Sequence, residues 1–170
     1  MDHDLYAFTV PVFSKMLGGL KTVLEKAKAH GLDEAALVND RLAPDMFDFK
    51  KQVQSACDNA KGCAARLAGV EIPKYEDTET TLDELIARID KTLAFLTTIT
   101  EAQYASAQAA EVQVVLPYFK DQFMTGYDYA REYAIPNFFF HTAMAYALVR
   151  KAGVAIGKAD YINGVPLQPF

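Results

Sequence analysis

The sequence predicts an all-α fold, a four-helix bundle formed by a single domain over residues 1–170. Two features indicate this fold. Apolar residues recur at intervals of three and four in four separate stretches, and helix-capping residues or glycines bracket these stretches. The chain is long enough for one substantial core and short for two, and 51% of its residues are hydrophobic. We expect helices near residues 5–30, 48–68, 81–100 and 126–151.

A glycine follows each of the first two stretches. Gly31 and Gly69 can adopt the left-handed conformation that commonly ends a helix. The stripe of the second stretch consists largely of small residues, which permit another helix to approach closely. The two stripes are Phe13, Leu17, Leu20, Leu24 and Ala27 in the first stretch, and Phe49, Val53, Ala56, Ala60, Ala64 and Leu67 in the second.

The third helix begins with a T-x-x-E capping box, formed by Thr81 and Glu84, and continues with a regular leucine and isoleucine stripe. The helical period is lost over residues 112–124, "VQVVLPYFKDQFM", where we expect a short hairpin-like insertion. The period resumes at Gly126. Pro136 should kink this fourth helix or displace one of its hydrogen bonds.

Composition excludes several classes of function. The net charge is -5 and the basic residues are scattered, so neither nucleic acid nor an anionic membrane is an expected partner. The start, "MDHDLYAFTV", lacks the features of a secretion signal, and no apolar run is long enough to span a membrane. Cys57 and Cys63 point about 120° apart on one helix, so we interpret them as buried hydrophobic residues of a cytoplasmic protein.

The stretch "NFFFHTAMAY", residues 137–146, carries the clearest chemical signal. His141 follows Asn137 by four residues and shares its helical face. Together with Gln54 and Asp58 of the second helix and Tyr133, these residues are candidates for binding a small molecule in a pocket between the second and fourth helices. They could instead be buried polar groups that hydrogen-bond one another or the amides of the second helix, among which Gln52 is also available.

No catalytic motif with a recognisable nucleophile, phosphate-binding loop or dinucleotide fingerprint is present, so no catalytic residue is assigned. Phe138, Phe139 and Phe140 are consecutive, which makes the fourth helix apolar nearly all round at this point. We therefore expect a homodimer that uses the fourth helix. Four tyrosines of the same helix could line the interface or a pocket: Tyr127, Tyr129, Tyr133 and Tyr146.

Three segments resemble the signature blocks of a bacterial family of unknown function that is grouped with the DinB/YfiT-like four-helix bundles. They are "RLAPDMFDFKKQVQSACDNAKGCAARLAG", "EDTETTLDELIARI" and "PNFFFHTAMAYALVRKAGVAIGKADY". The resemblance implies an up-down-down-up topology. A connection of about a dozen residues between the second and third helices agrees with it, because such a chain can extend ~40 Å, beyond the ~30 Å of a 20-residue helix.

The resemblance also implies a divalent metal held by three histidines, one on the second helix and two spaced H-x3-H on the fourth. Asn137 stands where that spacing requires a second histidine before His141, and the second helix has none. Because the chain contains only His3, His30 and His141, a three-histidine site is excluded and we expect a degenerate metal site without a cofactor. Two alternatives to small-molecule binding stay open: a dimeric structural or interaction protein without catalysis, and a metal-dependent enzyme with an unusual ligand set.

Overall fold

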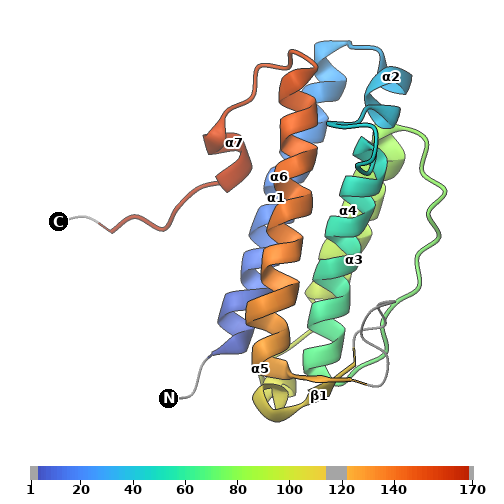
Figure 1. Cartoon of the computed structure of the whole chain (residues 1–170). Helices are drawn as coiled ribbons and strands as arrows, with labels where there is room; N and C mark the ends of the chain where they lie inside the picture. The colour runs from blue at the N-terminus through green and yellow to red at the C-terminus, as the bar shows by residue number, and fades with distance from the viewer. Residues whose placement is uncertain (1–3, 114–121, 169–170) are drawn as a thin grey trace.

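The computed structural model describes residues 4–113 and 122–168 and is dominated by four long helical rods that lie side by side (Figure 1). Three of the rods are α1 (Leu5–His30), α3 (Phe49–Ala68) and α4 (Leu82–Leu96). The fourth is composite: α5 (Gly126–Asp128), a π-helical segment, η3 (Tyr129–Ala134), and α6 (Ile135–Lys151). The shorter elements are α2 (Glu34–Asn39), α7 (Lys158–Ile162), the 3-10 turns η1 (Glu101–Tyr104) and η2 (Ala107–Ala109), and the strands β1 (Glu111–Val112) and β2 (Met124–Thr125).

The two glycines and the Thr81–Glu84 capping box set helix ends as the sequence predicted, and an aspartate cap that was not predicted starts α3. The Asp48 carboxylate accepts a hydrogen bond from the Lys51 amide at the start of α3, and the Thr81–Glu84 capping box starts α4. Gly31 and Gly69 end α1 and α3 at φ 73° and 68°, in the left-handed region.

The predicted end of the third helix was wrong. The helix α4 ends at Leu96, four residues before the predicted limit. The hydroxyls of Thr97 and Thr98 hydrogen-bond the carbonyls of Ala94 and Phe95, at 2.7 Å each. Threonine hydroxyls that bind nearby carbonyls compete with the helical backbone, and this competition accounts for the early end.

The core lies between the four rods. Phe13 of α1 packs on Phe138 of α6 with ring centroids 4.5 Å apart, and both side chains are fully buried. Small residues of α3 bring α3 and α6 together, as their stripe predicted. Cys57 and Cys63 are free and buried, and burial raises the pKa of each thiol to about 12. Both are inert hydrophobic residues of this core.

The connector from residue 70 to residue 81 runs alongside the rods between the end of α3 and the start of α4 (Figure 1). Arg88 of α4 holds it in place, because the guanidinium donates to the Glu76 carbonyl at 3.0 Å and to the Glu79 carboxylate at 2.9 Å. The Arg88 side chain is only 2% exposed. A buried arginine thus ties an irregular segment to the helical core.

The expected insertion lies where the sequence placed it. Val112 of β1 pairs with Met124 of β2 in antiparallel orientation, and residues 114–121 between the strands lie outside the described residues. A side chain at Gly126 would place its Cβ 1.8 Å from the Ala107 carbonyl oxygen, so only glycine lets α5 begin against η2. The sequence predicted that Pro136 would kink the helix or displace one of its hydrogen bonds. A π-helical segment, Tyr129–Ala134, lies directly before the proline, which agrees with a displaced hydrogen bond.

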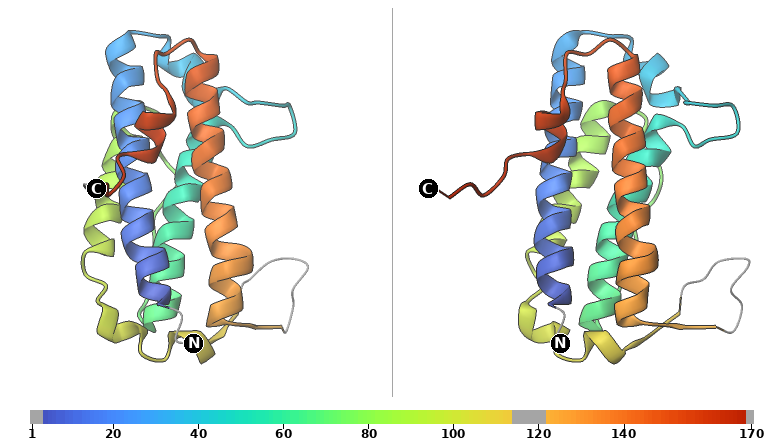
Figure 2. Two further views of the ribbon diagram at one scale, coloured as in Figure 1. Left: turned by 90° about the vertical axis from the view of Figure 1, so that its left-hand side faces the viewer. Right: turned by 60° about the vertical axis from the view of Figure 1, so that its left-hand side comes forward.

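The last described residues form α7, a short helix that the sequence did not predict and that lies against α1 (Figure 2). Gly18 and Gly19 of α1 make room for it. A Cβ at Gly19 would lie 2.7 Å from the Tyr161 carbonyl oxygen. The Asn163 amide also donates to the Lys15 carbonyl at 3.0 Å. In the described ranges, none of the helices is long and apolar enough to cross a membrane.

Candidate functional site

His141 and Gln52 meet at the interface between α6 and α3. The imidazole Nδ1 lies 2.7 Å from the Gln52 side-chain oxygen Oε1, and His141 is 7% exposed. Asp48 caps α3 one turn earlier and thereby fixes where Gln52 stands along the interface. The small residues of α3 let α6 come close enough for this side-chain hydrogen bond.

A second hydrogen bond fixes the direction of the Gln52 amide and, with it, the His141 tautomer. The Gln52 Nε2 group donates to the carbonyl oxygen of Phe47 at 3.3 Å. Because a carbonyl only accepts, the other end of the amide, Oε1, faces His141 as an acceptor. The proton of the neutral imidazole is therefore on Nδ1, and Nε2 carries the lone pair.

The second ring nitrogen of His141 is available. Among residues 4–113 and 122–168, none hydrogen-bonds Nε2, and Nε2 is not sealed inside the protein. Burial, and secondarily the positive charge of Lys51, lower the pKa of His141 below its usual 6.5. The ring is neutral at pH 7, so Nε2 can accept a hydrogen bond from a ligand.

Two aromatic side chains flank the imidazole. The Phe47 ring stacks on His141 with centroids 6.2 Å apart and planes within 16°, and the Phe140 ring meets it edge to face at 5.3 Å. Both phenylalanines are 49% exposed. The backbone bridge between Arg41 and Asp48 pins the loop that carries Phe47. The free nitrogen thus lies beside a partly exposed aromatic surface.

Asn137 lies one turn before His141 and bonds to a different partner. Its amide donates to the side-chain oxygen of Asn59 at 2.9 Å. Gln52 and Asn59 are seven residues apart on α3, so they share one face, and His141 and Asn137 share the facing side of α6. Two polar pairs therefore cross the α3–α6 interface in parallel, and the alternative of a direct His141–Asn137 bond is not observed.

Gln54 and Asp58 lie on the other side of α3, because they are two and six residues from Gln52 and are therefore rotated from it by about 200° and 240°. Gln54 donates to Glu79 of the connector at 2.8 Å. Asp58 lies 2.9 Å from both Arg88 and Lys61. The structure therefore does not bring these two candidates together with His141 and Asn137. They belong to the charged cluster around Arg88 that holds the connector.

Tyr133 lies in the π-helical segment. Its ring stacks on that of Tyr129, with centroids 6.0 Å apart. The Tyr129 hydroxyl in turn accepts a hydrogen bond from Arg66 at 3.2 Å. Tyr133 is partly buried two turns before His141. It lies on the same rod as His141 and Asn137, and in the described part of the chain it forms no hydrogen bond or ring contact with either of them.

Comparison with known proteins places the chain in a family. The model of a protein family described as "Domain of unknown function (DUF1993)" matches residues 5–162. The chain belongs to the DUF1993 family. It is also similar to the crystal structure of a DinB family member protein from Shewanella denitrificans, with 42% sequence identity and a TM-score of 0.91 over 97% of this chain and 95% of that chain. No curated protein matches it.

This membership confirms the resemblance drawn from the three sequence segments. The resemblance also implied three histidine ligands for a divalent metal. The donors that flank His141 in this DUF1993 chain are the neutral amides of Gln52, Asn59 and Asn137, and the described residues contain no group of three or more His, Cys, Asp or Glu side chains that could hold an ion. These residues do not fit a tight transition-metal site.

Sequence reasoning underrated three residues of this DUF1993 chain. Gln52 was available on the second helix but was not placed in the expected site, and Asn59 and Phe47 were not considered. The seven-residue spacing of Gln52 and Asn59 matches one helical face and was a readable signal. The burial of Arg88 could also have been predicted, since Arg88 lies three residues after Leu85, on the apolar face of the third helix.

Proposed function

We propose that the protein binds a small molecule that carries a hydrogen-bond donor, without a metal, at His141 between α3 and α6. The observation that supports this function best is the orientation of the Gln52 amide. It holds His141 as a neutral imidazole whose acceptor nitrogen, Nε2, has no hydrogen-bond partner among the described residues.

The surroundings define the chemistry of the ligand. A hydroxyl or N–H group donates to Nε2, and an apolar or aromatic body contacts the exposed faces of Phe47 and Phe140. Protonation of the ring removes the acceptor. Binding therefore weakens when the pH falls below the lowered pKa of His141.

Phenol and anisole provide a matched pair of probes, since they have similar shapes and only phenol has an O–H donor. We expect phenol to shift the ring resonances of His141 saturably in an NMR titration at pH 7.5, and anisole to bind about tenfold more weakly because it leaves Nε2 unpaired. His141→Leu should abolish the difference between the two probes.

His30→Gln is the control, because it removes an exposed histidine at the end of α1 and leaves the α3–α6 interface intact. It should bind phenol like the wild-type protein. Equal affinity for phenol and anisole, or equal phenol binding by His141→Leu and the wild type, would contradict the proposed site.

The exposed aromatic surface also favours a second candidate, a homodimer that uses α6. Phe140 on α6 and Phe47 in the adjoining loop are large, apolar and half exposed, which is typical of residues at an interface. A dimer without catalysis would cover the same surface that the ligand would contact. Sedimentation equilibrium separates the two candidates: a dimer that Phe140→Ser dissociates supports the interface, and an 18.8 kDa species at all concentrations excludes it.

We infer further that the four rods follow the up-down-down-up order of the DinB-like bundles, with a degenerate metal site. The lengthwise connector of residues 70–81 supports the parallel arrangement of α3 and α4 (Figure 1). Asn137 and His141 form hydrogen bonds with side-chain amides of α3, and this arrangement supports an ancestral site in which these two positions carried metal ligands.

A further inference from the structure

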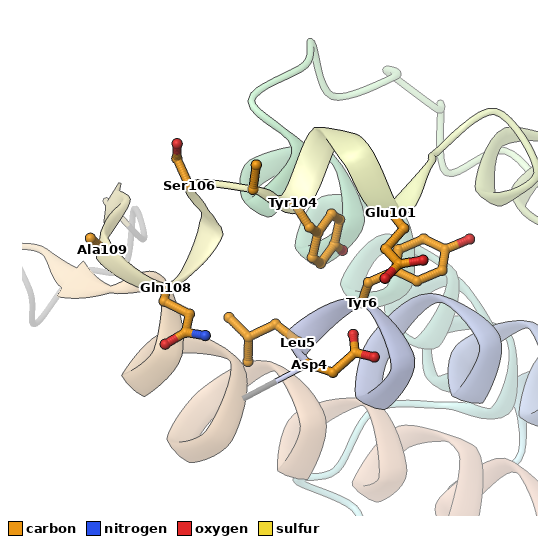
Figure 3. A pocket seen from close by; sticks show the side chains of 9 residues that line it. Asp4, Leu5, Tyr6, Glu101, Tyr104, Ser106, Gln108 and Ala109 are labelled. Carbon is orange, nitrogen blue, oxygen red and sulfur yellow. The ribbon is translucent and has the colours of Figure 1, made fainter. Parts of the chain in front are cut away.

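The start of α1 and the turns η1 and η2 enclose an open pocket of about 510 Å³ (Figure 3). The N-cap Asp4 and the first helical residues Leu5 and Tyr6 line it from the start of α1. The other side is lined by Glu101, Tyr104, Ala105, Ser106, Gln108 and Ala109. None of these residues belongs to the His141 site or to the cluster around Arg88. Its volume lies within the range of about 300–1,000 Å³ that suits small-molecule ligands.

The described residues that line the pocket carry a negative charge. Asp4 and Glu101 contribute carboxylates, and no Lys, Arg or His side chain is among these described lining residues. Within residues 4–113 and 122–168, neither carboxylate forms an ion pair, although ion pairs are frequent elsewhere on this surface. The Asp4 carboxylate is held in place because it caps α1 through the Ala7 amide at 2.9 Å.

Two tyrosine rings form a corner of the same pocket. Tyr6 and Tyr104 lie edge to face, with ring centroids 5.5 Å apart and planes at 85°. Both hydroxyls have protein partners: Tyr6 donates to the Ile99 carbonyl at 3.4 Å, and the Tyr104 hydroxyl lies 3.2 Å from Thr9 Oγ1. These contacts hold the rings in place, and because Tyr104 is only 7% exposed, the partly buried Tyr6 ring provides most of the π surface for a ligand.

We propose that this pocket binds a small organic cation, a primary or quaternary ammonium compound. An ammonium group is attracted by carboxylates and by the negative faces of aromatic rings, and the pocket provides both within one volume. A bare divalent ion fits less well, since Ca²⁺ takes six to eight oxygen ligands and no cluster of three or more metal-binding side chains occurs in the described part of the chain. The site is independent of ligand binding at His141.

Choline and 3,3-dimethyl-1-butanol test the proposal directly, because the alcohol has the same shape with a neutral carbon in place of the charged nitrogen. Each is titrated into the ¹⁵N-labelled full chain and followed by amide chemical shifts at low ionic strength. We expect choline to cause saturable shifts at Tyr6, Tyr104 and Ser106, and the alcohol to bind at least about fivefold more weakly. Saturable shifts that are equal for the two compounds, or no shifts at these residues, would overturn the proposal.

Two variants and a control identify the groups responsible. Glu101→Gln removes one charge from an exposed side chain without changing its shape, and should weaken choline binding about fivefold. Tyr6→Leu removes one ring and should weaken it about twofold to fivefold. Glu25→Gln changes the net charge of the protein equally, on an exposed part of α1 outside the pocket, and should leave binding unchanged. An equal effect of Glu25→Gln and Glu101→Gln would show that only the overall charge matters and would overturn the assigned site.

Discussion

The Nδ1 atom of His141 donates its proton to the Oε1 atom of Gln52 across the α3–α6 interface, over 2.7 Å. Gln52 accepts this proton because its own amide nitrogen is committed to the Phe47 carbonyl. The chain Phe47–Gln52–His141 therefore sets both the tautomer and the charge of the imidazole. In this DUF1993 protein, the Nε2 atom of His141 is therefore a neutral hydrogen-bond acceptor, whereas in a protonated histidine it would be a donor.

The depressed pKa of His141 makes stability depend on pH. In the unfolded chain the imidazole binds a proton near pH 6.5, whereas in the folded protein burial lowers that pKa. Stability is thus fully present above about pH 6.5 and declines as the pH falls toward the folded pKa, because the unfolded state then binds more protons. Urea denaturation at pH 7.5 and 5.5 should show a smaller pH-dependent loss in His141→Leu than in the wild type.

At pH 7.5 the same His141→Leu variant should be destabilised by about 1–3 kcal/mol, because the buried Gln52 oxygen loses its donor.

Identical pH dependence of stability in His141→Leu and the wild type would mean that His141 keeps an ordinary pKa in the folded state.

The metal content of the site should be negligible. One imidazole surrounded by the amides of Gln52, Asn59 and Asn137 offers too little donor strength for a closed tetrahedral site. Calorimetric titration of untagged protein with Zn²⁺ and Ni²⁺ should detect no sub-micromolar binding that depends on His141. Stoichiometric tight binding abolished by His141→Leu would restore the alternative of a metal-dependent enzyme.

Substitution of Arg88 should lower the free energy of unfolding more than substitution of an exposed charged residue. Its guanidinium lies about 3 Å from the carboxylates of Asp58, Asp77 and Glu79, and its Nε atom has no hydrogen-bond partner in the described structure. We expect Arg88→Ala to destabilise the fold by about 2–3 kcal/mol, less than the ~3–5 kcal/mol for breaking a fully buried pair, since Asp58 and Asp77 remain partly exposed.

Hydrogen exchange should show that Arg88→Ala also loosens the connector of residues 70–81. The exposed pair Lys28–Asp83 provides the comparison, because Lys28→Ala on the same surface should cost about 0.5 kcal/mol or less in free energy of unfolding. Equal destabilisation by the two substitutions would contradict the role of Arg88 as the anchor of the connector.

Gly19 should be required for the docking of α7. In Gly19→Ala the new Cβ would lie 2.7 Å from the Tyr161 carbonyl oxygen, which is too close to be accommodated without a shift of the backbone. We expect hydrogen exchange to speed up at residues 158–163, with little loss of overall stability because alanine favours the helix by about 1 kcal/mol. Lys15→Ala keeps the carbonyl that accepts from Asn163 and should leave this exchange unchanged.

The fold was largely predictable because local signals determine it. The limits of α1 and α3 follow from an aspartate cap and a left-handed glycine, and both are visible in the sequence. The end of α4 was missed because Thr97 and Thr98 act through their own hydroxyls rather than through a stop signal. The helix α7 was missed because it depends on the space above Gly18 and Gly19, which only the three-dimensional structure shows.

The candidate site was predictable in part. The position of His141 on the inner face of the fourth rod and its pairing with an amide of the second long helix follow from helical periodicity. Which amide pairs with it depends on the rotation of α3, and that rotation is set by its packing against both α6 and the connector. The sequence could not reveal that Arg88 draws Asp58 and Glu79 to the opposite face of α3, nor that Glu79 holds Gln54 there.

Long-range ¹H–¹⁵N NMR of the His141 ring at pH 7.5 is the most direct test of the neutral acceptor on which the proposed function depends. The geometry predicts a protonated Nδ1 and an unprotonated Nε2, with the preference lost in Gln52→Leu because the acceptor for Nδ1 is gone. An imidazolium, or a neutral ring with its proton on Nε2, would contradict it.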